Sequence, residues 1–206
     1  MKNEAIPSIM ANSQQELNEK IRKVNAKTYQ LDVMDWEFVK NESLTFPFNL
    51  PKGKKYEAHL MVSDPWKWVR ENSEKVDTII FHVESTDDTG EMIKLIKSKK
   101  KKVGIAINPE TSIKEVIPFL NKINMVLVMT ANPGSYGSKF IPETLGNVRR
   151  FRKLKPRLNI EVDGGINDKT IISSLNAGAN KFISGSYIQN SENPKKAFED
   201  LNKIIK

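Results

Sequence analysis

The chain contains no cysteine, which excludes disulfide bonds and zinc sites built from thiolates. Histidine is nearly as scarce, because His59 and His82 are the only 2 imidazoles in the sequence. Long apolar runs are missing too, and none approaches the roughly 20 residues that a membrane-spanning helix needs. Residues 1–7 lack the apolar core of a signal peptide. These absences predict a cytoplasmic protein with no membrane partner.

The composition is typical of one folded domain. Hydrophobic residues make up 38% and charged residues 28%, so a sizeable core can form beneath a well-solvated surface. A length of 206 residues favours a single domain over residues 1–206. The net charge is +8, with much of the lysine in exposed-looking runs such as 97–102. Because no aromatic residues are interleaved with these lysines, we expect no nucleic-acid partner; a diffuse positive field favours capture of a phosphorylated metabolite.

Short apolar segments alternate with helix-like segments, which is the pattern of an α/β fold. Several segments are apolar at nearly every position, as Val126-Leu127-Val128-Met129 shows, and strands buried on both faces have that character. The predicted strands are 5–10, 28–34, 56–61, 78–84, 103–108, 125–131, 159–163 and 181–184.

Helix signals fill most of the intervals. Ser13 opens a capping box, and Ser112 opens another that leads into an apolar helical stripe. Pro118 lies inside that stripe and predicts a kink or a short helix. One interval, 41–55, has prolines and no helical period, so we expect a loop where a helix would otherwise lie. Further helices are predicted over 142–153, 167–177 and 194–205.

Polar residues stand at the ends of the predicted strands. Asp32 and Asp163 end two of the apolar runs, and a third run ends near His59. If the strands are parallel, these ends gather on one face, which in a (β/α)₈ barrel is the face that carries the chemistry. Two carboxylates there can act as acid and base on opposite sides of one small substrate. Taken alone, such an aspartate is also typical of an Asx turn or a helix cap.

The chain resembles the ribulose-phosphate 3-epimerase family along nearly its whole length. Each matching piece is weak by itself, but their joint order and spacing are specific. The pieces are Pro7-Ser8-Ile9, Leu31-Asp32-Val33-Met34-Asp35, His59-Leu60-Met61-Val62, Phe81-His82-Val83-Glu84, Val103-Gly104-Ile105-Ala106-Ile107-Asn108-Pro109, Val128-Met129-Thr130, Asn132-Pro133-Gly134, Val162-Asp163-Gly164-Gly165-Ile166 and Ser184-Gly185-Ser186.

The resemblance implies a (β/α)₈ TIM barrel, with the helix after the second strand reduced to a loop. It also implies an isomerase that interconverts D-ribulose 5-phosphate and D-xylulose 5-phosphate through an enediolate. Asp32 and Asp163 would be the two acid/base groups at C3. Together with His59 they would bind a divalent metal ion (zinc, manganese, iron or magnesium), which neutralises a developing oxyanion.

The same resemblance assigns a set of substrate contacts. Methionine walls would keep water away from the reacting carbon, and glycines after the last two barrel strands would bind the phosphate of a small sugar phosphate through backbone N–H groups. The implied substrate-binding residues are Ser8, Met34, His59, Met61, Met129, Gly134, Gly137, Gly164, Gly165, Gly185 and Ser186.

Gln30 is the main departure from the family pattern, because it stands where the family normally has a metal-binding histidine. An amide oxygen suits zinc less well than an imidazole does. We therefore expect a weakly bound ion, a preference for magnesium or manganese, or no metal at all.

The other departures surround the predicted site. Trp36 replaces a glycine, and Tyr136 stands in what the family has as a glycine-rich mobile loop. Because of these two residues, one alternative function is an epimerase that acts on a different sugar phosphate. Because one metal ligand is lost, a second alternative is a non-catalytic barrel that binds a phosphorylated metabolite. We also expect a homo-oligomer.

Overall fold

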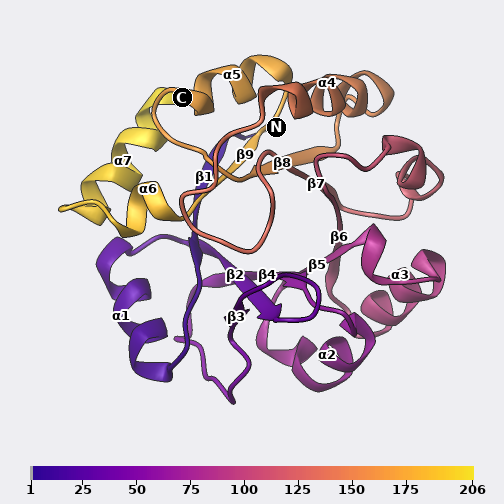
Figure 1. The fold of residues 1–206 in the computed structure, drawn as a ribbon, viewed down its shortest axis with the longest axis horizontal. Coiled ribbons are helices and arrows are strands. Elements are labelled where there is room, and N and C mark those ends of the chain that lie inside the picture. The colour runs from indigo at the N-terminus through magenta and orange to yellow at the C-terminus, as the bar shows by residue number, and fades with distance from the viewer. Residues whose placement is uncertain (1) are drawn as a thin grey trace.

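The computed structural model describes residues 2–206, which fold around a closed barrel of eight parallel strands. Strand β1 pairs with β9 on one side and with β2 on the other, which closes the sheet (Figure 1). The parallel strands are β1 (Glu4–Ile9), β2 (Thr28–Asp35), β4 (Lys55–Met61), β5 (Thr78–His82), β6 (Lys102–Ile107), β7 (Met125–Met129), β8 (Asn159–Asp163) and β9 (Lys181–Ser184). The predicted barrel is therefore confirmed, with strand ends that differ from the predicted ones by at most two residues.

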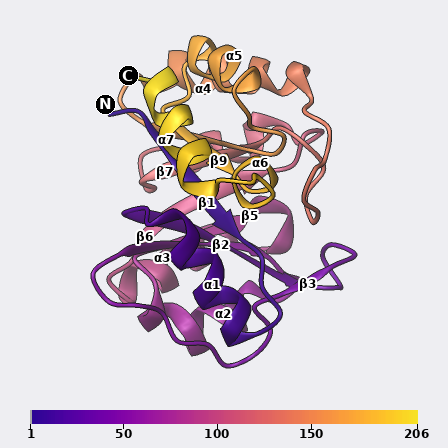
Figure 2. The ribbon, with the colours of Figure 1, turned by 90° about the vertical axis from the view of Figure 1, so that its left-hand side faces the viewer.

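Helices form an outer ring around the strands, as Figures 1 and 2 show. Ser13 caps the first helix as predicted, because its side chain accepts a hydrogen bond from the Glu16 backbone N–H at 3.2 Å. Gly178 ends the fifth helix with φ +108°, a conformation that glycine adopts without strain. The helices are α1 (Gln14–Val24), α2 (Pro65–Asn72), α3 (Thr89–Ser98), α4 (Leu145–Leu154), α5 (Thr170–Ala177), α6 (Ser186–Gln189) and α7 (Pro194–Ile204).

The ring is interrupted twice within residues 2–206. After β2 the chain forms a loop with a two-residue strand, β3 (Glu42–Ser43), antiparallel to β2, so the loop expected over 41–55 is confirmed. After β6 the helix expected from the second capping box is wrong in type. Two short 3-10 turns, η3 (Ile113–Glu115) and η4 (Ile117–Phe119), stand in its place. Pro118 explains this, because proline has no backbone N–H to donate and its ring collides with the preceding turn of an α-helix.

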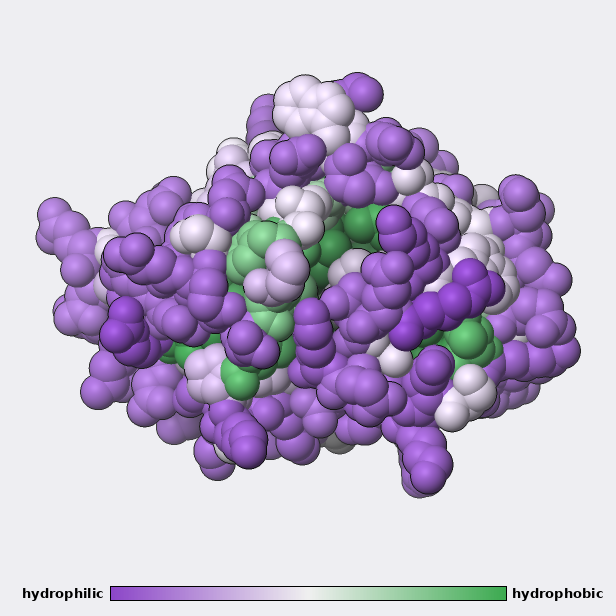
Figure 3. Space-filling view, turned by 90° about the horizontal axis from the view of Figure 1, so that it is seen from below, coloured by the Kyte–Doolittle hydropathy of each residue, from purple (hydrophilic) through white to green (hydrophobic). Residues whose placement is uncertain are grey.

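The loop after β2 leaves a groove against α2. Figure 3 shows apolar side chains in a hollow of the otherwise hydrophilic face that carries this loop, α1 and α2. The groove encloses about 520 Å³, and Leu44, Phe46 and Trp68 are among its lining residues.

Among the described residues, no helix is both long and apolar enough to cross a membrane.

The inside of the barrel is divided into an apolar and a polar half. Ile80, Ala106, Met125, Leu127 and Met129 form one apolar cluster on β5, β6 and β7. Opposite them, β8, β9, β2 and β4 send buried polar side chains inward. Lys181 pairs there with the carboxylates of Glu57 and Glu161 near the amino-terminal end of the strands. The polar half continues upward to the aspartates at the carboxyl-terminal end.

Candidate active site

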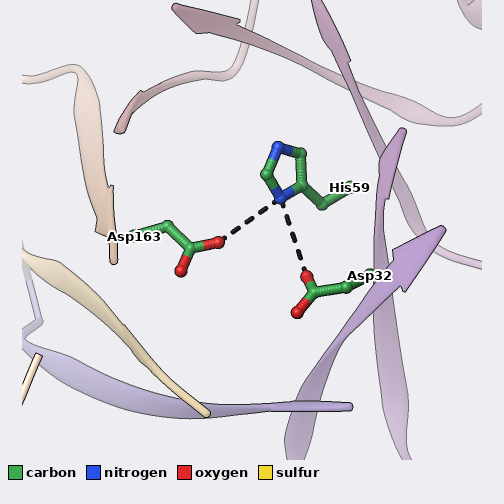
Figure 4. A group of neighbouring side chains, drawn as sticks. All are labelled: Asp32, His59 and Asp163. Carbon is green, nitrogen blue, oxygen red and sulfur yellow. Dashed lines mark ion pairs between the residues drawn. The ribbon is translucent and has the colours of Figure 1, made fainter. Parts of the chain in front are cut away.

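The two aspartates and His59 converge at the carboxyl-terminal end of the barrel, as predicted (Figure 4). Asp32 and His59 are register partners on the neighbouring strands β2 and β4, and Asp163 reaches them from β8. The His59 Nδ1 atom lies 3.6 Å from Asp32 Oδ1 and 3.3 Å from Asp163 Oδ2. His59 is fully buried and Asp32 nearly so, whereas Asp163 is partly exposed. The parallel strands thus bring one cationic group between two acids.

Gln30 joins the two carboxylates through its side-chain amide. Its Nε2 donates a hydrogen bond of 2.7 Å to Asp32 Oδ1 and one of 2.6 Å to Asp163 Oδ2. The same nitrogen lies 3.4 Å from His59 Nδ1. Its Oε1 is buried without a hydrogen-bond partner among the described residues. The amide N–H₂ therefore stands amid the groups that would hold a cation, a role that the sequence did not reveal.

A chain of hydrogen bonds supports His59 from behind. Its Nε2 lies 2.9 Å from His82 Nε2, and His82 Nδ1 lies 3.2 Å from Glu84 Oε2. Burial lowers the pKa of His82 to about 4, although the neighbouring Glu84 carboxylate acts to raise it. His82 is therefore neutral. A neutral His82 that donates to Glu84 through Nδ1 accepts the His59 N–H at Nε2. This chain fixes the orientation of the His59 ring, as second-sphere partners do at metal-binding histidines.

Burial and charge set the protonation of the central groups. Burial alone would lower the pKa of His59, but the carboxylates of Asp163 and Asp32 raise it to about 9. Burial raises the pKa of the Asp32 carboxyl, and the negative charge of Asp163 raises it further. Hydrogen bonds from His59 and Gln30 lower this pKa, but by less than burial raises it. Two acids in unequal surroundings can divide the roles of proton donor and acceptor.

A small cavity of about 50 Å³ opens directly above the aspartates. Its lining includes ten of the eleven residues predicted to contact substrate. The exception is His59, which lies behind the carboxylates with no exposed surface. The ten are Ser8, Met34, Met61, Met129, Gly134, Gly137, Gly164, Gly165, Gly185 and Ser186.

Glycine is required at both positions that follow β8 in this lining. Gly164 has φ +114°, and a Cβ there would lie 2.5 Å from the Ala131 side chain. Gly165 has φ +68°, and its Cβ would lie 2.9 Å from the Phe140 backbone nitrogen. Any other residue would need both a left-handed backbone and a displaced neighbour. The Gly-Gly pair thus lets the chain after β8 turn tightly beside the cavity.

The two aromatic departures have different positions. Trp36 has φ +66°, is 54% exposed and does not line the cavity, so it does not reshape this pocket. Tyr136 does line it. Its hydroxyl donates to the Ser8 carbonyl at 3.0 Å and accepts from the Met10 N–H at 3.0 Å. Burial raises the pKa of Tyr136, so the phenol stays neutral and able to donate.

The donor set fits a divalent metal ion in part. One ligand atom each from Asp32, His59 and Asp163 lie within 4.8 Å of one another, which is the spacing that a shared cation requires. Gln30 fits only if its amide turns over, because the nitrogen now faces the carboxylates while the unpartnered oxygen faces away from them. The three groups can therefore hold an ion, and Gln30 competes with it until the amide reverses.

The chain is similar to known proteins over almost its entire length. The model of the ribulose-phosphate 3 epimerase family matches residues 4–189. A ribulose-phosphate 3-epimerase of Schizosaccharomyces pombe is 33% identical, with 97% of this chain and 93% of that protein covered. The cytoplasmic isoform of Oryza sativa subsp. japonica is 36% identical, with coverages of 97% and 91%.

Solved structures share the fold at low sequence identity. A 3-hexulose-6-phosphate synthase has a TM-score of 0.69 at 16% identity, with 100% of both chains covered. The orotidine 5'-monophosphate decarboxylase of Sulfolobus solfataricus has a TM-score of 0.66 at 17% identity, with 99% of this chain and 98% of that chain covered. At these identities the likeness concerns the barrel alone.

Proposed function

Because the chain belongs to the ribulose-phosphate 3-epimerase family, and is therefore an isomerase that acts on carbohydrates, we propose that it interconverts D-ribulose 5-phosphate and D-xylulose 5-phosphate. The observation that carries the proposal is the convergence of Asp32 and Asp163 beneath one cavity, from strands on different sides of the barrel. Inversion at a carbon next to a carbonyl needs a proton taken from one face and a proton returned to the other.

The two carboxylates divide these steps between them. Asp163, the more exposed acid, takes the C3 proton from one epimer, and Asp32, whose carboxyl pKa is raised by burial, supplies a proton to the opposite face. In the reverse direction the roles exchange. The enediolate between these steps carries negative charge, and the cationic His59 and the N–H₂ of Gln30 lie beside both carboxylates where they can stabilise it. Met34, Met61 and Met129 would exclude water from the intermediate.

A divalent ion would be held by Asp32, His59 and Asp163, with Gln30 as a weak fourth group. Such an ion supplies a Lewis acid for the developing oxyanion. The sugar phosphate would place its phosphate on the backbone at Gly164, Gly165, Gly185 and Ser186, since the loops after the last two strands commonly bind phosphate in this fold.

Solvent deuterium incorporation tests the reaction directly. We expect the protein, incubated with ribulose 5-phosphate in deuterated water, to form xylulose 5-phosphate with deuterium at C3. Other ketose phosphates run in parallel would show whether a different sugar is the better substrate. If no ketose phosphate gains deuterium at C3, with or without added divalent metal, then epimerisation is not the activity of this site.

The metal affinity is expected to be limited by Gln30. Gln30→His should tighten zinc binding by about 10- to 100-fold, because a set of two histidines and two aspartates suits zinc. The substitution also removes the amide N–H₂ that now bridges the two carboxylates. Titration of chelator-treated proteins with zinc, manganese and magnesium measures the change. Gln15→His, an exposed position on α1, adds the same side chain away from the site and should leave affinity unchanged. Stoichiometric zinc retained by the wild type through purification would contradict the expectation.

We infer that the chain self-associates and is located in the cytoplasm. Its relatives include a cytoplasmic isoform, and the apolar groove beside β3 provides surface that a second copy could cover. Light scattering across a concentration series would determine the oligomeric state.

A further inference from the structure

Tyr136 lines the proposed sugar-phosphate site and lies against Gly185. The segment 132–138, which we call the lid, crosses the mouth of the barrel after β7 (Figure 1). Its tyrosine ring packs so closely on Gly185 that a Cβ there would lie 2.5 Å from Tyr136 Cε1 and 2.7 Å from Ser8 Oγ. The ring therefore lies against Gly185 and beside Ser8, two residues assigned above to substrate.

The lid is fastened at two places. At its tip, the Tyr136 hydroxyl bridges the Ser8 carbonyl and the Met10 N–H, at 3.0 Å each. The Lys20 Nζ atom lies 5.6 Å from the ring centroid, within the range of a cation–π contact. Nearer its start, the Asn41 side-chain amide donates to the Gly134 carbonyl at 2.7 Å. Gly134 and Gly137 flank the tyrosine with φ +102° and +80°, which gives the lid glycine joints on both sides.

The remaining cavity is too small for a pentulose phosphate. It holds about 50 Å³, whereas ligand sites typically enclose about 300–1,000 Å³. Space for substrate beside Gly185 appears only if the ring leaves. The hydroxyl contacts are hydrogen bonds to backbone groups, so the departure costs two weak hydrogen bonds, the Lys20 contact and the packing of one ring.

We propose that Tyr136 is an intramolecular occupant of the phosphate end of the site, which the sugar phosphate displaces on binding. The inference rests on the proposed function for the identity of the substrate, but not for the displacement itself. A site that is open in only a fraction of the molecules binds its ligand more weakly by that fraction. Tyr136 thereby sets the substrate affinity of this chain.

Removal of the hydroxyl tests the affinity. Tyr136→Phe loses both hydrogen bonds, so we expect KM for ribulose 5-phosphate to fall by about three- to tenfold with kcat nearly unchanged. Tyr136→Gly should lower it further. Tyr187→Phe is the matched control, because Tyr187 is partly exposed on α6 and lies outside the cavity lining. A higher KM in Tyr136→Phe would mean that the phenol binds the substrate and would overturn the proposal.

Hydrogen exchange at Met10 tests the displacement without any turnover. The Met10 amide donates to Tyr136 Oη, so it should be protected in the free protein and should exchange faster in Tyr136→Phe. Inorganic phosphate, at concentrations that calorimetry shows to be saturating, should likewise speed this exchange in the wild type. Unchanged exchange at Met10 under saturating phosphate overturns the proposal, as does absence of phosphate binding in both wild type and Tyr136→Gly. Phosphate-driven exchange in a protein that fails to epimerise any ketose would leave the displacement standing and reject the proposed function.

Discussion

Asp32→Asn and Asp163→Asn are each expected to lower kcat for epimerisation by about 10²- to 10⁴-fold while the barrel stays folded. Each substitution removes one of the two groups that exchange protons at C3 and keeps its size. Asp163 ends β8 and Asp32 lies in the carboxyl-terminal half of β2, and both side chains line the cavity rather than the main apolar core, so the loss should be chemical. Asp168→Asn, an exposed carboxylate five residues beyond Asp163 in the sequence, should retain wild-type turnover.

Isotope exchange makes the two-base assignment more specific. A variant that keeps one carboxylate can still remove and return a proton on one face of the sugar. Asp32→Asn should therefore incorporate solvent deuterium into one epimer without inversion, and Asp163→Asn into the other. Proton NMR of the C3 position measures both. If the two variants exchange the same epimer, or if both epimerise at the wild-type rate, the assignment of opposite faces is wrong.

Lys181→Met is expected to reduce the free energy of unfolding by about 3–5 kcal/mol, because it leaves two buried carboxylates without their counter-charge. The Lys181 amine pairs with Glu57 and lies 3.4 Å from Glu161 Oε2. Burial would lower the pKa of Lys181, but Glu161 and Glu57 raise it above its usual 10.5. A raised lysine pKa stabilises the fold fully below pH 10.5, so the loss applies at neutral pH.

Urea unfolding at pH 7 measures this loss. The matched control is Lys195→Met, since Lys195 is 66% exposed on α7 and pairs with Glu199 at 4.0 Å, a contact worth less than about 1 kcal/mol. The triple variant with Glu57→Gln and Glu161→Gln should recover part of the stability by removing the stranded charges. A Lys181→Met protein as stable as the control would show that water reaches these carboxylates.

The sequence contained enough to predict the barrel and its main acids. The apolar runs located all eight parallel strands, because strands buried on both faces leave an unbroken apolar signal. The motif order placed Asp32, His59 and Asp163 in one family pattern, and the closed sheet brings them together. The glycine-rich pieces around Gly164 and Gly185 likewise line one cavity.

What the sequence could not supply depends on contacts across the barrel. The direction of the Gln30 amide follows from two carboxylates on β2 and β8, which no local pattern records. The position of the Tyr136 side chain depends on a hydrogen bond from its hydroxyl to the Ser8 carbonyl, 128 residues away in the sequence. A signal for the buried ion cluster was present, however. Glu57 with His59, and Glu161 with Asp163, place polar residues two apart in apolar strands, which marks the inward face.

The division of the barrel interior bears on how this protein can be altered. The inward side chains Ile80, Ala106, Met125 and Leu127 on β5, β6 and β7 form an apolar cluster, so swaps such as Ile80→Val or Leu127→Met can be absorbed by repacking of neighbours. Side chains on β8, β9, β2 and β4 are tied by charge and hydrogen bonds, so a change at one demands a matched change at another. Directed evolution should therefore accumulate neutral substitutions in one half of the wall and compensated pairs in the other.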